Sequence, residues 1–99
     1  MAVETREFDA ARYLDNEEAI AAYLADATES GDAAEIAYAL GVVARAKGIG
    51  DIAKATGLSR ESLYKTFKET SKPEFDTVRR VMQSMGVKLV AEPIEDKVA

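Results

Sequence analysis

Apolar residues recur at intervals of three and four along most of the chain, and short polar or glycine-containing stretches separate these repeats. Such spacing places the apolar side chains on one face of a helix. Glycines and Pro73 mark where the repeats stop or restart. The pattern predicts five helices, running from Asp15 to about Ser30, from Asp32 to Lys47, from Gly50 to Thr56, from Ser59 to Phe67, and from just beyond Pro73 to just before Gly86.

Two of these helices begin with the same signal, an aspartate followed three residues later by a glutamate. At Asp15 and again at Asp32 the aspartate can accept from the free backbone N–H groups of the first turn, and the glutamate can reach back. Leu14 is expected to pack on the first turn of its helix. Four large side chains on the helical stripes are expected in the core: Tyr23, Phe75, Met82 and Met85.

The stretch 48–67 has the pattern of a helix-turn-helix. Gly57 suits a left-handed residue that ends a helix, and Leu58 can fill the corner after it. Ser59 can then cap a second helix, in which Leu63 and Phe67 form an apolar pair one turn apart. The opposite face of that second helix is polar and contains several basic residues. Such a face is what reading base edges in a major groove requires.

The last part of the chain changes period. Val87 to Ala91 is short and rich in β-branched residues, which predicts a β-strand that Pro93 ends. Its backbone groups need a partner, and the simplest partner is the same strand of a second copy. We therefore predict an all-α, five-helix domain spanning residues 1–99 with one C-terminal strand at 87–91. Residues 1–13 are predicted to be irregular and 94–99 to form a tail.

Composition narrows the function. The 99 residues include 47% hydrophobic side chains, enough for one modest core, and neither cysteine nor histidine. That excludes disulfides, thiolate or imidazole metal ligands and the commonest general base, so no cofactor is expected and an enzyme is disfavoured. The N-terminus lacks a signal-peptide pattern and no stretch is apolar enough for a membrane span. We expect a cytoplasmic protein with no membrane partner.

The net charge of −5 conceals an uneven distribution. Residues 1–40 contain ten acidic and two basic side chains, whereas residues 41–90 contain ten basic and five acidic ones. This division indicates two surfaces with different partners, one of them an anionic polymer. Solvated faces without a partner are the alternative. A metal site at Asp9, Asp15, Glu17 and Glu18 is rejected, because two of these residues belong to a capping signal.

Candidate DNA contacts lie on the second helix of the 48–67 stretch. Arg60 is the leading base reader, since it lies one residue past the cap and a guanidinium pairs bidentately with guanine. Glu61 can accept from cytosine, or can serve only as a carboxylate near a helix N-terminus. The predicted base readers are Arg60, Glu61, Tyr64 and Lys65, and the predicted phosphate contacts are Ser59, Ser62, Lys68 and Lys72. A helix-turn-helix used only for protein contacts is the alternative.

A dimer is predicted on independent grounds. One recognition helix covers only a few base pairs, whereas a two-fold dimer reads a palindromic site in double-stranded DNA with two helices one helical turn apart. The predicted dimer interface consists of Val81, Met85, Val87 and Leu89.

Several stretches between Phe8 and Pro93 resemble one family: FDAARYL, EEAIAAYL, ALGVVARAKG, TGLSRESLYKTF, FDTVRRVMQSMG and VKLVAEP. The chain is similar there to the addiction-module antidote proteins, which are antitoxins of type II toxin–antitoxin pairs in the Xre/Cro/C1 class of helix-turn-helix repressors. The resemblance implies a lambda-repressor-like fold and a homodimer that represses its own operon. It also implies a cognate toxin, a small basic ribonuclease of the RelE/ParE superfold, for which the acidic N-terminal third is the expected docking region.

One departure from the family is visible at the start of the first motif helix. Relatives often carry a Ser or Thr cap and a Gln that contacts phosphate, whereas this chain has Gly50 and Asp51. Base reading is therefore expected mainly from Arg60 and its neighbours. A stand-alone transcriptional regulator without a toxin remains an alternative at the level of sequence.

Overall fold

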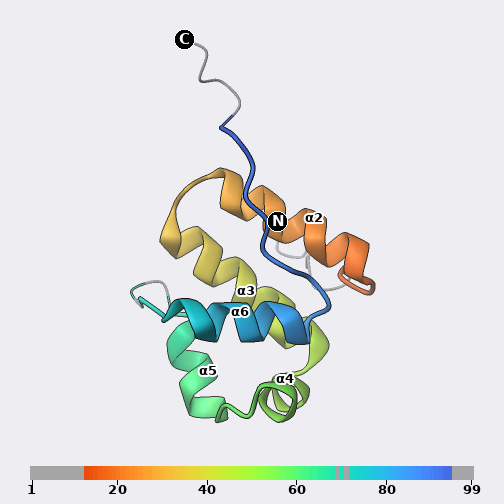
Figure 1. Cartoon of the computed structure of the whole chain (residues 1–99). Coiled ribbons are helices and arrows are strands. Elements are labelled where there is room, and N and C mark those ends of the chain that lie inside the picture. Colours follow the sequence, from red (N-terminus) through yellow and green to blue (C-terminus); the bar gives the residue numbers. More distant parts are fainter. Residues whose placement is uncertain (1–12, 69, 71, 95–99) are drawn as a thin grey trace, which may run out of the picture.

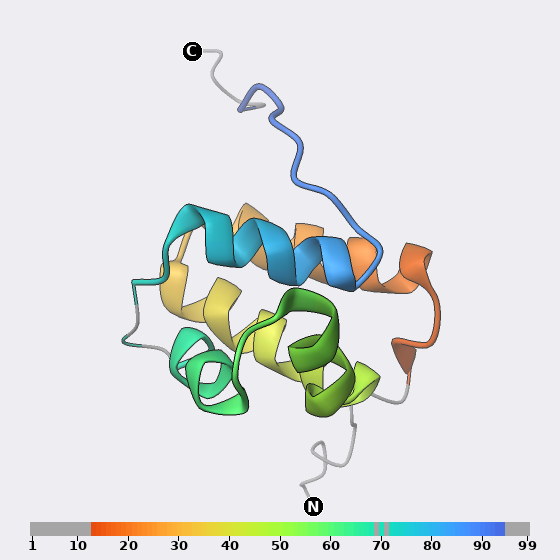
Figure 2. The same cartoon turned by 60° about the horizontal axis from the view of Figure 1, so that its bottom comes forward.

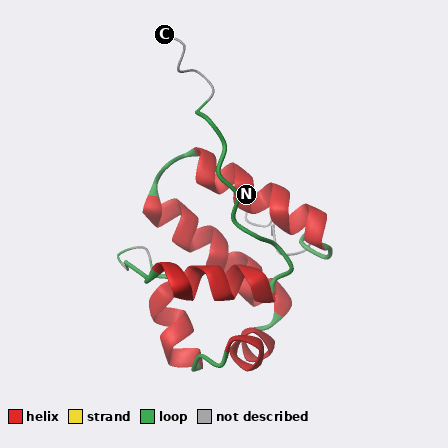
Figure 3. Ribbon diagram, in the orientation of Figure 1, coloured by secondary structure: helices red, strands yellow, loops and turns green. Residues whose placement is uncertain are grey.

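The computed structural model describes residues 13–68, 70 and 72–94, and these form an all-helical fold (Figure 3). Five helices are present in this part of the chain: α2 (Glu17–Glu29), α3 (Ala33–Lys47), α4 (Ile49–Thr56), α5 (Arg60–Thr66) and α6 (Phe75–Ser84). The prediction of five helices is confirmed for the described residues. The predicted irregular segment 1–13 lies outside them apart from Tyr13, and the predicted tail 94–99 lies outside them apart from Ile94.

The helices divide into two groups, which are joined where α3 contacts α4. Helices α2 and α3 are connected by a short turn and pack side by side, while α4 contacts α3, α5 and α6. Figures 1 and 2 both place α2 at one end of the molecule and the α4–α5 pair at the other. The acidic helix α2 and the α4–α5 pair thus lie at different ends of the fold.

Side-chain caps begin α2 and α3. Asp32 caps α3 as predicted, because its Oδ1 accepts from the N–H of Ala34 at 3.0 Å. For α2 the predicted cap was wrong by one residue: Asn16 is extended and its Oδ1 accepts from the N–H of Ala19 at 2.8 Å. Asp15 instead accepts from the Asn16 amide. Asparagine caps helices as well as aspartate does, so the D-x-x-E spacing did not determine which of the two residues caps α2.

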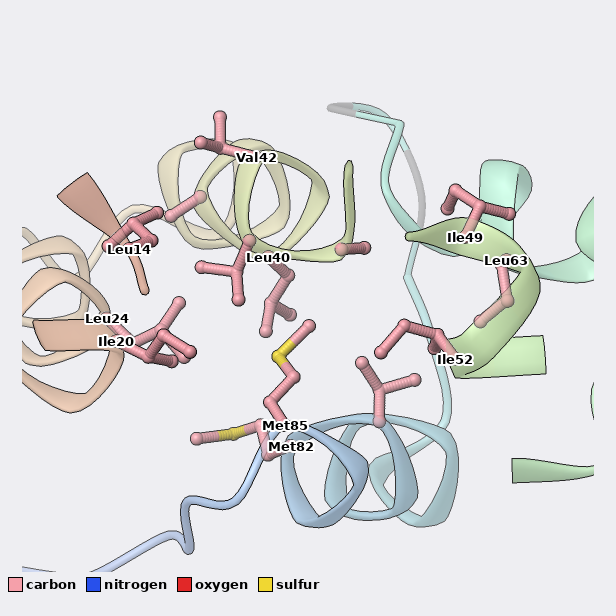
Figure 4. Packing of buried hydrophobic residues seen from close by; sticks show 14 residues of the cluster. Leu14, Ile20, Leu24, Leu40, Val42, Ile49, Ile52, Leu63, Met82 and Met85 are labelled. Carbon is pink, nitrogen blue, oxygen red and sulfur yellow. The ribbon is translucent and has the colours of Figure 1, made fainter. Parts of the chain in front are cut away.

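A single hydrophobic core connects the two groups of helices. Its buried side chains come from all five helices; Leu24, Leu40, Ile52 and Met85 point toward one another in Figure 4. Leu63 of α5 and Val81 of α6 are fully buried in the same cluster, which also includes Leu14, just before α2. Burying each such side chain stabilises the fold by about 1.5–3 kcal/mol. Both ends of the molecule therefore share one source of stability.

Of the four large side chains predicted for the core, Met82 and Met85 are buried, whereas Phe75 and Tyr23 are not fully buried. Phe75 is 70% exposed, so its assignment to the core was wrong. It is the first residue of α6, one turn before Val78, and Val78 is itself only half-buried at the edge of the cluster. Tyr23 is also half-buried and packs against the cluster from outside.

The α6 helix ends in a glycine-dependent turn. Gly86 has φ +88°, and the N–H of Val87 donates to the carbonyl of Met82 at 3.1 Å. Beyond this turn the chain passes α2 before it extends away from the helices (Figures 1 and 2), and Val87, Lys88 and Val90 line a hollow together with residues of α2. Residues 87–91, predicted as a strand, form none in the single chain, and no strand occurs anywhere in the described residues. A ladder needs a second strand, which these residues do not supply, so pairing with a second copy stays a prediction.

Among the described residues, no helix combines the length and the apolar character needed to cross a bilayer.

Candidate nucleic-acid interface

The turn between α4 and α5 is held by specific hydrogen bonds. Gly57 adopts the predicted left-handed conformation, with φ 78° and ψ 10°, and its N–H donates to the carbonyl of Ala53 at 2.9 Å. The buried Thr56 hydroxyl donates to the carbonyl of Ile52 at 2.8 Å and accepts from the N–H of Leu58 at 3.2 Å. Because one hydroxyl satisfies groups on both sides of the glycine, the angle between the two helices is fixed locally.

A residue from α6 stabilises the same turn. The Arg80 guanidinium donates to the carbonyl of Thr56, which lies at the C-terminal end of α4, where a cation is favoured. Arg80 also lies 3.9 Å from a carboxylate oxygen of Asp76. Sequence reasoning missed both Thr56 and Arg80. The contact between Arg80 and Thr56 spans 24 residues, so no local pattern in the sequence indicates it. The position of Thr56 directly before the turn glycine is the signal that could have identified this residue.

The start of α5 is capped as predicted. The Ser59 Oγ accepts from the N–H of Ser62 at 3.0 Å. Because the hydroxyl acts as acceptor in this bond, its own hydrogen remains available for a phosphate oxygen. Leu63 and Thr66 of α5 are buried, which turns the opposite face of the helix toward solvent.

The predicted contact residues gather on that outward face. Arg60, Glu61, Ser62, Tyr64 and Lys65 are all exposed, and the Tyr64 side chain retains 52% of its accessible surface. Lys68 and Lys72, which follow the helix, are exposed as well. Helix α5 thus presents a guanidinium, an amine, hydroxyls and one carboxylate to solvent, a combination suited to both phosphate oxygens and base edges.

Arg60 has a defined neighbour on α4. A side-chain carbon added to Gly50 would lie 2.9 Å from Nη2 of Arg60, so the guanidinium rests against the first turn of α4 in the space left by the glycine. The structure therefore gives Gly50 a role that the sequence did not: it makes room for Arg60.

The other end of the molecule carries a groove along the outer seam of α2 and α3. It has a volume of about 590 Å³, and its lining includes Tyr23, Asp26, Glu35 and Tyr38. Burial raises the pKa of the Tyr23 hydroxyl above its ordinary value, as does Tyr38, while the Arg45 charge lowers it. The Tyr23 hydroxyl is thus neutral at physiological pH and available as a donor.

No group of three or more histidine, cysteine, aspartate or glutamate side chains that could hold a metal ion occurs within the described ranges.

Residues 4–93 match the model of a protein family described as probable addiction module antidote protein. This chain belongs to that family. The antidote chain is also 38% identical over 87 residues to an uncharacterized protein of Haemophilus influenzae, with 88% of this chain and 90% of the relative covered. No solved structure matches it. An antidote implies a cognate toxin as partner, and a non-enzymatic role.

The antidote's predicted dimer residues are placed very differently from one another. Val81 and Met85 are fully buried in the core of the single chain, so in this conformation they have no surface to offer a partner. Their helical stripe faces inward, toward α2, α3 and α4. Val87 is half-buried, whereas Leu89 is 42% exposed and Val90 is 69% exposed. A dimer built on the C-terminal segment must therefore use Leu89 and its neighbours.

Proposed function

We propose that this protein is the antitoxin of a type II toxin–antitoxin module and acts as a sequence-specific DNA-binding autorepressor, with α4 and α5 as a lambda-repressor-like helix-turn-helix. The observation that carries the proposal is the outward face of α5, where Arg60, Tyr64 and Lys65 are exposed on a helix that follows a turn held by Thr56 and Gly57. Charged side chains on a rigidly oriented short helix are costly to bury against protein but well matched to a major groove.

The overall negative charge is compatible with DNA binding because of its distribution. Residues 41–68 contain six basic and two acidic side chains, and the acidic α2 lies at the opposite end of the fold (Figure 1). In this proposal Arg60 reads guanine, with Glu61, Tyr64 and Lys65 as further base contacts. Ser59, Ser62, Lys68 and Lys72 then contact phosphates on either side, which fixes the register of the helix.

The proposed DNA-binding form is a homodimer on a palindromic operator. Two copies of α5 one helical turn apart supply the specificity that one short helix lacks. The exposed Leu89 and Val90, in a segment without a ladder partner, support pairing of residues 87–91 across a two-fold axis. A monomeric mass by light scattering at micromolar concentration would remove this part of the proposal.

The second proposed activity is neutralisation of the cognate toxin, a small protein of the RelE/ParE type. The family supports the toxin partner, and the acidic end of the molecule supports its basic character. Binding of toxin and DNA by opposite ends would allow one antitoxin to hold both.

Substitution of the leading base reader tests the DNA-binding activity. Arg60→Ala should lower affinity for the protein's own upstream DNA by about 1–3 kcal/mol while changing affinity for random DNA by less than about twofold. Arg79→Ala is the matched control, because it removes the same charge from an exposed position on α6. Fluorescence titration with both DNAs measures the difference. Equal losses on the two DNAs, or an equal loss in the control, would contradict base reading by Arg60.

Salt dependence tests the phosphate contacts separately. If Lys68 and Lys72 of two protomers each neutralise one phosphate, affinity should fall about a hundredfold between about 50 and 200 mM salt. The same titration performed over a salt series measures this slope. A flat response would exclude a phosphate-dominated interface.

A further inference from the structure

We propose that the groove between α2 and α3 is the docking site for a basic segment of the toxin, with an arginine or lysine side chain seated between Tyr23 and Tyr38 and paired with Asp26 and Glu35. The inference rests on the proposed function for the existence of the toxin, and it specifies which surface of the antitoxin holds it.

The groove exists because small side chains line the seam of the helix pair. Ala27 on α2 and Ala34 on α3 contribute only methyl groups there, while the larger Tyr23 and Tyr38 project beside them. The space of about 590 Å³ is open to solvent and large enough for one or two long side chains. Tyr38 retains 56% of its accessible surface although α3 is otherwise the most buried helix of the fold. Tyrosine is one of the residues enriched among those that anchor protein interfaces.

The chemistry of the lining selects a cation. Tyrosine rings attract an ammonium or guanidinium over their faces, and Asp26 and Glu35 supply a carboxylate from each helix. The charge around the groove is also negative, because residues 13–40 contain seven acidic side chains and no basic one. A guanidinium fits best, since its planar fork can pair with a carboxylate while it stacks on a ring.

Within the described residues, Arg45 is the positive charge that acts on a side chain of this groove. Arg45 acts on the Tyr23 hydroxyl, but it is an exposed residue in the last turn of α3 and is not part of the groove lining. Asp26 and Glu35 belong to the opposite end of the groove, toward the turn that joins α2 and α3. The incoming cation is therefore expected at the Asp26–Glu35 end.

The position of the groove allows simultaneous binding of DNA. Figures 1 and 2 both place the α2 end of the molecule away from α4 and α5, which carry the candidate DNA contacts. The groove lining comes from α2 and α3 and the candidate contacts of α5 are separate from it, so the two proposed sites share no residue.

Charge neutralisation within the groove provides the first test. The product of the neighbouring reading frame, purified as the candidate toxin, is titrated calorimetrically against the full-length antitoxin. The double variant Asp26→Asn, Glu35→Gln should bind at least about tenfold more weakly. Asp15→Asn with Glu92→Gln is the matched control: it changes the net charge equally at two exposed residues outside the groove, and should alter affinity by less than about twofold.

The aromatic contact is tested at Tyr38. Tyr38→Ala should weaken binding about fivefold, whereas Tyr38→Phe, which keeps the ring, should stay within about twofold of the unsubstituted protein. Because all of these side chains are at least partly exposed, the variants should fold, and circular dichroism with thermal melting checks that they do.

The outcomes separate the groove from the broader proposal. Toxin binding that is unchanged in the groove variants overturns the groove while leaving the antitoxin function in place, and so does an equal loss in the charge-matched control. A groove variant with an altered oligomeric mass would assign the groove to a second copy of the chain instead. No binding by the unsubstituted protein overturns the toxin partner together with the groove.

Discussion

The α2–α3 hairpin and the α4–α5 pair differ in what orients their exposed surfaces. Between α2 and α3 the exposed Ser30 hydroxyl donates to the Ala27 carbonyl at 2.7 Å and accepts from the N–H of Asp32 at 3.0 Å, and the alanines that line the seam leave its outer side hollow. Between α4 and α5 a buried hydroxyl, a left-handed glycine and an arginine from α6 all act on one turn. A surface that reads DNA needs an accurately oriented helix, whereas a groove that accepts a flexible basic side chain needs space and charge.

The two surfaces nevertheless depend on the same core. Leu24 from the acidic end and Leu63 from the basic end belong to one cluster of buried side chains (Figure 4). Each surface is thus oriented by its own turn, while both are stabilised by the same hydrophobic core. Substitutions in the core should affect both surfaces together, and substitutions in the turn should affect only one.

The largest effect is expected from shortening a core side chain. Leu63→Ala should lower the free energy of unfolding by about 2–5 kcal/mol, because it removes a fully buried side chain and leaves a cavity. Leu24→Ala at the other end should cost a similar amount. Urea unfolding followed by far-ultraviolet circular dichroism and by tyrosine fluorescence measures both. If the two signals separate in either variant, the ends of the molecule unfold independently and the shared core is contradicted.

A smaller, local effect is expected at the turn. Thr56→Val keeps the shape of the buried side chain but leaves the N–H of Leu58 without its acceptor, which should cost about 1–2 kcal/mol of stability. DNA affinity should fall further than this loss of stability explains, because the orientation of α5 is relaxed, whereas binding at the α2–α3 groove should stay unchanged.

Thr28 supplies the control for that substitution. Its hydroxyl donates to the carbonyl of Ala25 on the exposed surface of α2, so Thr28→Val should change stability by less than about 0.5 kcal/mol. Thermal melts and DNA titrations of both variants make the comparison. Equal effects of the two substitutions would show that the Thr56 hydrogen bonds do not hold the turn.

Local signals in the sequence were sufficient for the helices and for the turn. The periodicity of apolar residues, Gly57 and the cap at Ser59 each depend on a few neighbouring residues, and each is confirmed. The exposed position of the predicted contact residues on α5 follows from the burial of Leu63, one turn after the cap.

The sequence could not supply what depends on distant residues. The contact of Arg80 with Thr56, the space that Gly50 leaves for Arg60 and the groove between Tyr23 and Tyr38 all join different helices. The spacing of apolar residues also does not show which of the residues on a helical face are buried in the core and which lie beyond its edge. That is why Phe75 was expected inside, and why Val81 and Met85, which lie at the centre of the core, were expected at an interface. The strand at 87–91 depends on a second molecule and remains a prediction.

The smallest effect on stability, and the most specific one on recognition, is expected at Gly50. Gly50→Ala should stabilise α4 by up to about 1 kcal/mol through helix propensity. The added carbon would lie 2.9 Å from the Arg60 guanidinium, which is the mobile end of a long side chain, so Arg60 should move rather than the backbone. We therefore expect a protein that is at least as stable but has several-fold altered affinity for its own upstream DNA.

A double-mutant cycle with Arg60→Ala isolates this effect. If Gly50 acts by making room for Arg60, then Gly50→Ala should change DNA affinity in the unsubstituted protein but not in the Arg60→Ala background, giving a coupling of about 0.5–1 kcal/mol. Fluorescence titration of the four proteins, with thermal melts beside it, measures both parts. The same change in affinity in both backgrounds would mean that the methyl group acts on α4 itself, and that the specificity of α5 does not depend on the neighbouring helix.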